Sequence, residues 1–532
     1  MIEGEVGSAG SGYLLLASIR AADGETLATF RRTASDGSEV IRAIDGLSQD
    51  IRERAGESLR SIRAGEPLEA VTTSSLEALR LYTEAVRARD LGELTRSRAL
   101  LEESVRVDPD FAMGWRGLSL VLNDVGGEPQ EIRDAATRAY EMRHRLTDRE
   151  RYKAVAWYHD RVTGDIQQQI VAYQTLLDLY PDDETGLNNL ATAYSELARW
   201  EDATALLERA IQGSGTSRSA YTNRVLYLSL SGDFGEARQA LDELETRYPE
   251  NELWRSWTGF ILAWSEWDAD EAERRATSLQ RLDEAPNWRR TGTRALAFSY
   301  ALTGQLSAAR EVFEGARMEA VRQGAPIDAV QAWLEQAMVH PLFGLDPAPT
   351  VEAMLASGLL EEIPPQFRSN SQWIPFIAWT GFVDEARGLL DEWEEASMGL
   401  QNRQIQTART LVDAYALAED DPASAAAAIE GLRATSGCDR CNAWELGTLY
   451  ERAGRTQDAI RERERSAAAG QNFYFGMHRM AAHEALGRLY EEVGDTAKAV
   501  EHYAVYVERL ANGPDLPSVR DARLRLQALA GA

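Results

Sequence analysis

The stretch that decides the fold is LNNLATAYSELARWEDATALLERA, residues 187–210. Its apolar and small residues recur every three or four positions in two successive runs, which is typical of two amphipathic helices. Ala198 stands between the runs, where the first helix would end. A small residue such as Ala191 lets paired helices approach closely, and a larger one such as Leu207 fills the remaining gap. The stretch therefore predicts a helix–turn–helix unit.

The same spacing recurs along the chain. A glycine that ends one helix is followed five positions later by a small residue, and four positions after that by a large apolar one. The matches are Gly92, Ser97 and Leu101; Gly232, Ala237 and Leu241; Gly304, Ala309 and Phe313; Gly381, Ala386 and Leu390; and Gly494, Ala499 and Tyr503. Glycine accepts the left-handed backbone that closes a helix, and Asp233 or Asp495 just after it can cap the next one. The repetition predicts a solenoid in which each repeat packs only on its neighbours.

These segments resemble tetratricopeptide (TPR) repeats, which are about 34 residues long. The resemblance covers the chain from about Ser74 to Leu510, and the signature is only partial at 112–146, 252–285 and 326–358. It implies an all-α fold, a TPR-like α-solenoid in which helix pairs form a superhelix. It specifies no ligand.

The first 66 residues have a different pattern. Two β-favouring runs, 12–21 and 25–33, are joined by Asp23-Gly24, which is a strong signal for a hairpin turn. Residues 38–62 then show helical periodicity. Because two strands alone are marginally stable, we expect this hairpin and helix to be part of an α/β module that continues upstream of Met1.

Prolines divide the remainder of the chain. They stand at positions 341, 347, 349, 364 and 365, so helices there must be short or kinked. We therefore expect a partial α/β module at 1–66, a first block of repeats at 67–340, a proline-rich joint at 341–366 and a second block at 367–532. The tail from Pro517 onward is expected to form a closing helix.

The charge balance excludes some classes of partner. The chain has 57 basic and 85 acidic residues, a net charge of −28, which argues against direct binding of nucleic acid or anionic membranes. No run approaches the ~18 to 20 consecutive apolar residues of a membrane span. The sequence therefore predicts protein or peptide partners and no span. It leaves open whether the chain works in the cytoplasm or on the extracytoplasmic face of a bacterial membrane.

The motifs that could indicate catalysis lack their context. Asp233-Phe234-Gly235 spells the metal-binding tripeptide of protein kinases, but it falls in a repeat turn and no kinase catalytic loop precedes it. Gly7, Gly10 and Gly12 have the wrong order for a nucleotide-binding loop. The sequence therefore predicts no catalytic residue, no cofactor and no enzyme activity.

The two cysteines, Cys438 and Cys441, are separated by two residues. This spacing suits a local disulfide or a pair of free thiols, and it can also supply half of a zinc site. His478 and His483 would then complete the four zinc ligands.

Four of the thirteen tryptophans are spaced so that most of them share one helical face. Such a stripe either packs in the core or forms an aromatic anchor in the concave groove, where Trp and Arg contribute much of the binding energy. The four are Trp254, Trp257, Trp264 and Trp267, with Arg289-Arg290 as a flanking cluster. The candidate partner-binding residues are Trp254, Trp257, Trp264, Arg274 and Arg275.

Three further segments carry a closer resemblance. GSGYLL at 10–15, ESLRSIR at 57–63 and VTTSSLEAL at 71–79 are similar to the non-catalytic C-terminal region of bacterial serine/threonine protein kinases and related regulators. In that family a TolB-like module precedes the TPR array. The kinase domain is absent here, so no kinase activity passes to any residue. The resemblance implies a scaffold or sensor in a signalling system. The alternatives are a stand-alone regulator that acts on transcription through a partner, and a metal-dependent enzyme at the cysteine pair.

Overall fold

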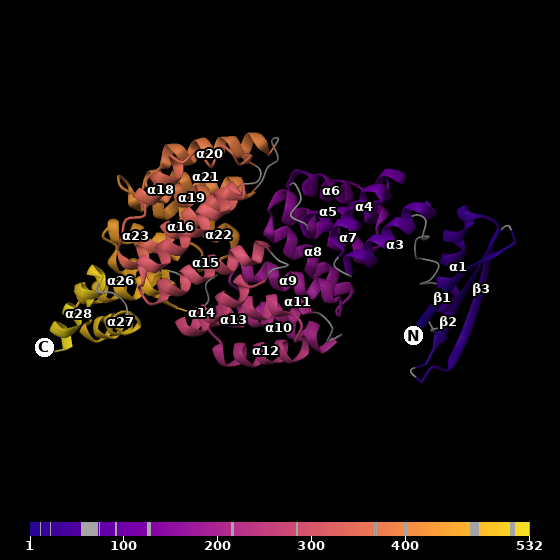
Figure 1. Cartoon of the computed structure of the whole chain (residues 1–532), viewed down its shortest axis with the longest axis horizontal. Coiled ribbons are helices and arrows are strands. Elements are labelled where there is room, and N and C mark those ends of the chain that lie inside the picture. Colours follow the sequence, from indigo (N-terminus) through magenta and orange to yellow (C-terminus); the bar gives the residue numbers. More distant parts are fainter. Residues whose placement is uncertain are drawn as a thin grey trace. The chain divides into compact units, whose positions relative to one another are not determined.

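The structure is a computed structural model of the whole chain (Figure 1). It describes all residues except 11, 22, 55–72, 74, 91–92, 125–128, 214–217, 283–285, 366–367, 369, 398–402, 469–477, 511–515 and 531–532. The chain divides into two compact units, Met1–Gly164 and Asp165–Ala532. Helices dominate both units, and the first also holds a small sheet.

The sheet of the first unit has three antiparallel strands in the order β1-β2-β3. The strands are β1 (Ile2–Ala9), β2 (Gly12–Arg20) and β3 (Thr26–Ala34). The predicted hairpin forms between β2 and β3, and a third strand that the sequence did not predict, residues 2–9, pairs with β2 along its whole length. The predicted turn lies between β2 and β3, with Gly24 at a φ of 88°. That further strands precede Met1 stays a prediction.

One helix, α1 (Val40–Arg54), packs against the sheet. Val40 and Leu47 of this helix lie in an apolar cluster with Leu15, Ala17 and Ala34 of the strands. The 3-10 turn η1 (Gly37–Glu39) leads into it. The last part of the predicted helix, including Leu59 and Ile62, lies outside the described residues.

Helix pairs follow in the first unit. Their elements are α3 (Leu76–Asp90), α4 (Leu94–Val107), α5 (Ala112–Asp124), α6 (Pro129–Glu141), η2 (Arg143–Arg145), α7 (Asp148–Tyr158) and the π-helical turn η3 (His159–Thr163). Leu101 of α4 and Leu118 of α5 belong to one buried cluster, so the second helix of one pair packs on the first helix of the next.

The second unit continues the pairs. Its elements are α8 (Ile166–Leu179), α9 (Glu184–Glu196), α10 (Trp200–Gly213), α11 (Arg218–Ser231), α12 (Phe234–Arg247), α13 (Glu252–Glu266), α14 (Ala269–Gln280), α15 (Pro286–Leu302), α16 (Leu306–Arg322), α17 (Pro326–Val339), η4 (His340–Phe343), α18 (Ala348–Leu355), α19 (Asn370–Trp379), α20 (Val383–Ala396), α21 (Arg403–Ala416), α22 (Pro422–Ser436), α23 (Ala443–Arg452), α24 (Thr456–Ala467), α26 (His478–Glu492), α27 (Thr496–Arg509) and α28 (Pro517–Ala530). The stretch 187–210 forms α9 and α10, as predicted, and α28 is the predicted closing helix.

The turns inside the pairs have the predicted left-handed backbone. Gly232, Gly304, Gly381 and Gly494 all have positive φ, whereas Gly92 lies outside the described residues. Ala198 has a φ of 54°, so alanine does take the glycine position there. Trp267 has a φ of 62° and ends α13 in the same way, which explains why the signature is only partial at 252–285.

Of the two aspartates predicted to cap helices, one does so. The Asp495 side chain accepts a hydrogen bond from the Lys498 backbone N–H at the start of α27. The prediction for Asp233 is wrong, because its carboxylate accepts from the Ser231 hydroxyl at 2.6 Å and makes no cap bond to α12.

Replacing Ala198 by glycine is expected to raise the free energy of unfolding by about 0.5–1 kcal/mol. Alanine in the left-handed conformation costs about 1–2 kcal/mol, and glycine avoids this cost. Glycine also gives the unfolded chain more conformational entropy, which offsets part of the gain. Urea denaturation of the full chain measures this, with Ala203→Gly as the matched control, since Ala203 is a fully buried residue inside α10. A loss of stability at Ala198 as large as that of the control would contradict the assignment.

The proline-rich segment forms short elements, as predicted. α18 has eight residues, with Pro347 at its N-cap position. The apolar core does not stop there, because Leu334 of α17, Met354 of α18 and Trp373 of α19 belong to one buried cluster. That this segment separates two blocks of repeats stays a prediction.

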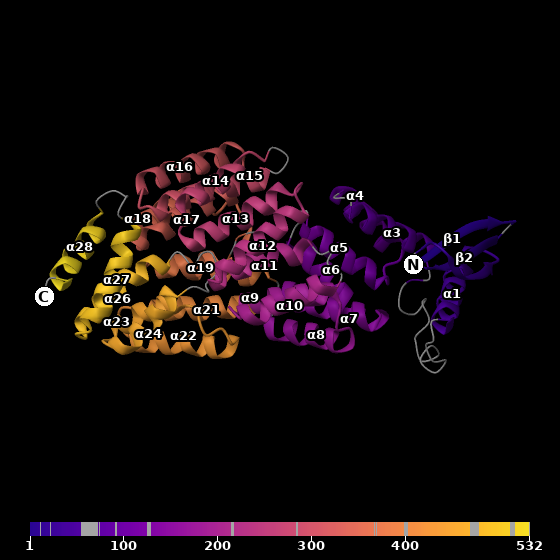
Figure 2. The ribbon, with the colours of Figure 1, turned by 90° about the horizontal axis from the view of Figure 1, so that it is seen from below.

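The expectation that each repeat packs only on its neighbours is wrong for the second unit. Phe298 of α15 and Phe343 of η4 share a buried cluster with Tyr503 of α27. The ribbon views show α26 and α27 on the side of this unit where α18 and α23 also lie (Figures 1 and 2). The Arg479 guanidinium of α26 donates to the Ser265 carbonyl oxygen of α13 at 2.9 Å. The superhelix therefore brings repeats together that are about 200 residues apart, which the local spacing of a repeat does not encode.

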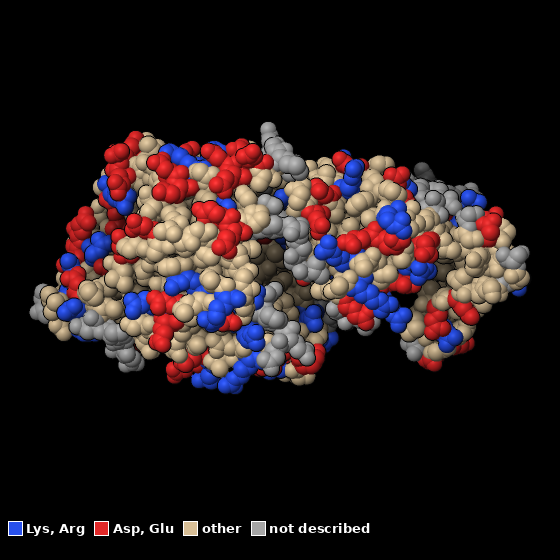
Figure 3. All heavy atoms as spheres, turned by 45° about the horizontal axis from the view of Figure 1, so that its top comes forward, with Lys and Arg blue, Asp and Glu red and all other residues tan. Residues whose placement is uncertain are grey.

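On the face drawn in Figure 3, acidic and basic side chains are interspersed. Many charged side chains of the protein form ion pairs one helical turn apart, such as Arg106 with Glu103 and Arg322 with Glu319. Among the helices of the described residues, none has the length and apolar character needed to cross a lipid bilayer.

Candidate partner-binding site

Three tryptophans form a half-buried aromatic cluster. They lie near the starts of α13 and α15, which are the first helices of two consecutive helix pairs. Trp254 and Trp257 come from α13, and Trp288 comes from the first turn of α15. The ring of Trp288 lies 5.2 Å from that of Trp254 and 5.6 Å from that of Trp257, with both pairs edge to face. Edge-to-face contacts stabilise such a cluster while leaving part of each ring exposed. We call these three residues the tryptophan cluster.

The other two tryptophans of the stripe lie elsewhere. Trp264 is 4% exposed and packs edge to face on Phe298 at 5.8 Å, so it belongs to the core. Trp267 ends α13, and the guanidinium groups of Arg479 and Arg509 lie 4.7 and 4.8 Å from the centre of its ring. Cation–π contacts therefore fix Trp267 against α26 and α27. The core interpretation therefore holds for Trp264, and the anchor interpretation stays a prediction for Trp254 and Trp257.

The two candidate arginines of α14 make ion pairs with carboxylates. Arg274 is exposed and contacts Glu271 at 2.6 Å. Arg275 lies between Glu271 at 2.6 Å and Glu245 of α12 at 2.8 Å. Its side chain also covers Gly259, where a Cβ would come within 2.8 Å of the Arg275 Nε. Arg275 thus ties α12, α13 and α14 together.

A pocket of about 500 Å³ lies beside the tryptophan cluster in sequence and is lined by α14, α15, α16 and the first turn of α17. Its α15 wall begins at Arg289, the residue after Trp288. The side chains that argue for a polar ligand are Arg289, Arg290, Arg294, Glu319 and Asp328.

The charges of this pocket are unequally neutralised. Arg290 contacts Asp328 at 2.7 Å, and Arg294 contacts the buried Glu335 at 2.9 Å. A hydrogen bond from Arg322 holds the pKa of Glu319 below its usual value, so this carboxylate is already paired. Arg289 is exposed and forms no ion pair with a described residue, although its charge also contributes to the lowered pKa of Glu319. An exposed guanidinium therefore lines this pocket one position after Trp288 in the sequence.

Sequence reasoning missed Trp288 because it considered one helix at a time. Trp288 stands 31 positions after Trp257, close to the repeat length, so a comparison of equivalent positions in successive repeats could have found it. It also missed a chain of side-chain amides that joins α8, α9 and α11. Asn223 donates to Asn188, Asn188 to Asn189, and Asn189 to the Tyr173 hydroxyl, each at 3.1 Å.

The four side chains of the zinc alternative are not arranged as a metal site. Cys438 and Cys441 are bonded to each other. His478 stacks on Trp444 with ring centres 4.8 Å apart, and the Nδ1 of His483 lies 2.9 Å from the Nδ1 of His502. Among the described residues, no group of three or more His, Cys, Asp or Glu side chains could hold a metal ion.

Many solved structures resemble the chain, and two of them illustrate the likeness. One is the APC/C hetero-tetramer Cut9–Hcn1, at 15% sequence identity and a TM-score of 0.40, with 87% of this chain and 77% of that chain covered. The other is a tetratricopeptide repeat protein from Parabacteroides merdae, at 15% identity and a TM-score of 0.29, with 55% of this chain and 99% of that chain covered. No protein-family model and no curated protein matches the sequence. Because both TM-scores are low, the assignment rests on the chain's own helix pairs and turn residues: the protein is a TPR-like α-solenoid with a small N-terminal sheet.

Proposed function

We propose that the protein is a scaffold or sensor module that binds a peptide segment of a partner protein at the tryptophan cluster and Arg289. The observations that support this most are the partly exposed aromatic cluster and the exposed Arg289, which follows Trp288 in the sequence and forms no ion pair with a described residue. Aromatic and arginine side chains are the residue types that most often dominate binding energy at protein interfaces. From the resemblance to bacterial kinase-associated regions we further propose that this role belongs to a signalling system and that residues 1–66 form a TolB-like module.

The chemistry of the site specifies the partner. An apolar or aromatic side chain would pack on the tryptophan rings, and a carboxylate a few residues away would pair with Arg289 in the mouth of the pocket. The net charge of −28 disfavours a highly acidic partner as a whole, so we expect one or two acidic residues at the contact. Trp264 and Arg275 support the site from inside and do not touch the partner.

Selection of 12-residue peptides from a random display library against the purified full chain tests the proposal. The selected peptides are expected to share an aromatic or large apolar residue next to Asp or Glu. Arg289→Glu and Trp257→Ala should each weaken their binding at least tenfold in calorimetry, about 1.4 kcal/mol or more, because both lie at the centre of the contact.

Arg274→Ala is the matched control. Arg274 is also an exposed arginine, but it pairs with Glu271 and does not line the pocket. The affinity of the Arg274→Ala variant for the selected peptides should stay within twofold of that of the native chain. Peptides that bind all three variants equally well would show that the partner uses another surface, and thermal unfolding of each variant separates lost binding from lost folding.

A further inference from the structure

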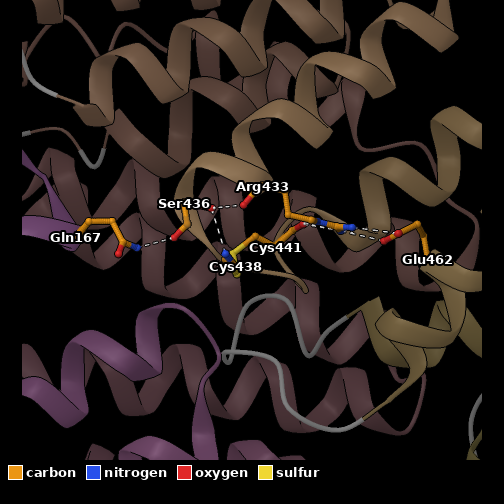
Figure 4. Close-up of a disulfide and its surroundings, with 6 residues drawn as sticks. All are labelled: Gln167, Arg433, Ser436, Cys438, Cys441 and Glu462. Atoms are coloured by element: carbon orange, nitrogen blue, oxygen red, sulfur yellow. Dashed lines mark hydrogen bonds and ion pairs between the residues drawn. A yellow bond between two sulfur atoms is a disulfide. The ribbon is translucent and has the colours of Figure 1, made fainter. Parts of the chain in front are cut away.

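A disulfide closes the short loop between α22 and α23 (Figure 4). It joins Cys438 to Cys441, with the two Cα atoms 5.5 Å apart. Cys438 is 1% exposed, whereas Cys441 is only partly buried, so a reductant would approach the bond from the Cys441 side. The backbone enters this loop through Gly437 and leaves it through Asn442, both with left-handed φ.

One side of the loop is held by a buried ion pair. Arg433 of α22 donates to the Cys441 carbonyl oxygen through Nε at 2.9 Å and Nη2 at 2.7 Å. The same guanidinium donates to Glu462 of α24 at 3.0 and 2.9 Å. Removing one acceptor from a buried charged group is costly, so the position of the Cys441 carbonyl contributes to joining α22 with α24.

The other side of the loop contacts the first helix of this unit. The Gln167 side chain of α8 donates to the Ser436 carbonyl oxygen at 3.0 Å, across 269 residues of chain. The Ser436 hydroxyl accepts from the Cys438 backbone N–H at 3.3 Å. Next to this contact, Asp165 at the N-cap of α8 pairs with Arg403 of α21 at 3.3 Å. The disulfide loop thus lies where α8 meets repeats from the far end of the chain.

We propose that the Cys438–Cys441 bond is a redox-controlled clasp that holds α8 against the α22–α23 loop when oxidised and releases it when reduced. Two thiol sulfurs cannot remain at bonding distance and must move apart to van der Waals contact. Because Cys438 is enclosed, that movement displaces the loop backbone. The Ser436 and Cys441 carbonyl groups then leave Gln167 and Arg433.

The step is a thiol–disulfide exchange with a dithiol reductant. One thiolate of the reductant attacks the Cys441 sulfur and forms a mixed disulfide, while Cys438 departs as a thiolate and takes up a proton. The second thiolate of the reductant then attacks the reductant sulfur that is bonded to Cys441. Cys441 leaves as a thiolate and is also protonated. The protein gains two electrons and two protons, and the reductant becomes a cyclic disulfide.

Hydrogen exchange of the full chain with and without dithiothreitol tests the clasp. Reduction is expected to speed amide exchange at least tenfold in residues 166–173 and 436–443, while the buried helix α19 keeps its rate. The double variant Cys438→Ser, Cys441→Ser should show the fast rates in both conditions. In Gln167→Ala, the amides of α8 should exchange quickly even when the disulfide is oxidised. The amides of the loop should still exchange faster on reduction, as in the native chain.

Three results would overturn the proposal. Equal exchange in α8 before and after reduction would show that the bond does not control the contact. If reduction accelerated amide exchange equally in all helices of the second unit, the disulfide would only stabilise the unit as a whole and would not control the contact with α8. Alkylation of both cysteines in the aerobically purified, non-reduced chain would show that the bond does not form.

Discussion

Replacing Trp373 by alanine is expected to lower the free energy of unfolding by about 3 to 5 kcal/mol, because a large enclosed ring leaves a cavity that its surroundings fill only in part. Trp373 lies on α19 and is 2% exposed. Its indole Nε1–H donates to the Gln331 side-chain oxygen of α17 at 2.9 Å, so the substitution also leaves a partly buried acceptor without its donor. The ring belongs to the cluster that continues from α17 to α26.

Urea denaturation of the full chain, followed by circular dichroism, measures this loss. Trp373→Phe is the matched control, since it keeps an aromatic ring but loses the hydrogen bond, and its loss should be about 1 to 2 kcal/mol. If the alanine variant were within 1 kcal/mol of the native chain, the continuous core across the proline-rich segment would be wrong.

Acidification is expected to lower the free energy of unfolding of the second unit because two buried histidines, His478 and His483, resist protonation. The expected loss for each histidine is about 1 kcal/mol between pH 7 and pH 5.5, and about 2 kcal/mol between pH 7 and pH 4.5. Burial, then His502, Arg479 and Arg509, lower the pKa of His483 to about 4. Burial, then Arg463, lowers the pKa of His478 to about 3. Protonation of both His483 and His502 would also set two N–H groups against each other, since their Nδ1 atoms are 2.9 Å apart.

The sign follows from the order of protonation. The unfolded chain takes up these protons near pH 6.5, whereas the folded chain does so only at the lower pKa of each histidine. The two histidines therefore leave the free energy of unfolding unchanged above about pH 6.5, and they lower it progressively as the pH falls from there towards their folded pKa values of about 4 and about 3, where the loss levels off. His478→Phe keeps the stacking on Trp444 but does not titrate, so it should halve the slope between pH 6.5 and 5. An unchanged slope would contradict the assignment of His478.

The repeat architecture could be predicted from sequence because its determinants are local. A turn residue such as Gly304 needs a left-handed backbone, and the small residue five positions later packs where two helices meet, so both recur at fixed spacing. Degenerate repeats lose the signature and keep the fold. Trp267 shows this, because it has a left-handed φ where other repeats have glycine, and its ring contacts Arg479 and Arg509 more than 200 residues away.

The candidate site was predicted only in part, because it depends on which helices become neighbours. Trp254 and Trp257 were identified from their spacing, but Trp264 has the same helical spacing and is buried against Phe298. Arg274 and Arg275 are near the tryptophans in the sequence, but both form ion pairs with Glu271, which the spacing of the residues did not reveal. β1 was missed because Gly4 and Gly7 interrupt its apolar alternation, and its pairing with β2 supplies what the local pattern lacks.

A charge exchange between the protein and its peptide tests most directly the central claim that a partner carboxylate binds Arg289 beside the tryptophan cluster. The affinities of the native chain and of Arg289→Glu are measured by calorimetry for a selected acidic peptide and for the same peptide with lysine at the acidic position. Each single exchange should weaken binding at least tenfold, and the double exchange should restore most of the loss, a coupling of about 1.5 kcal/mol or more. Losses that simply add in the double exchange would contradict the account, because they would show that the two groups do not meet.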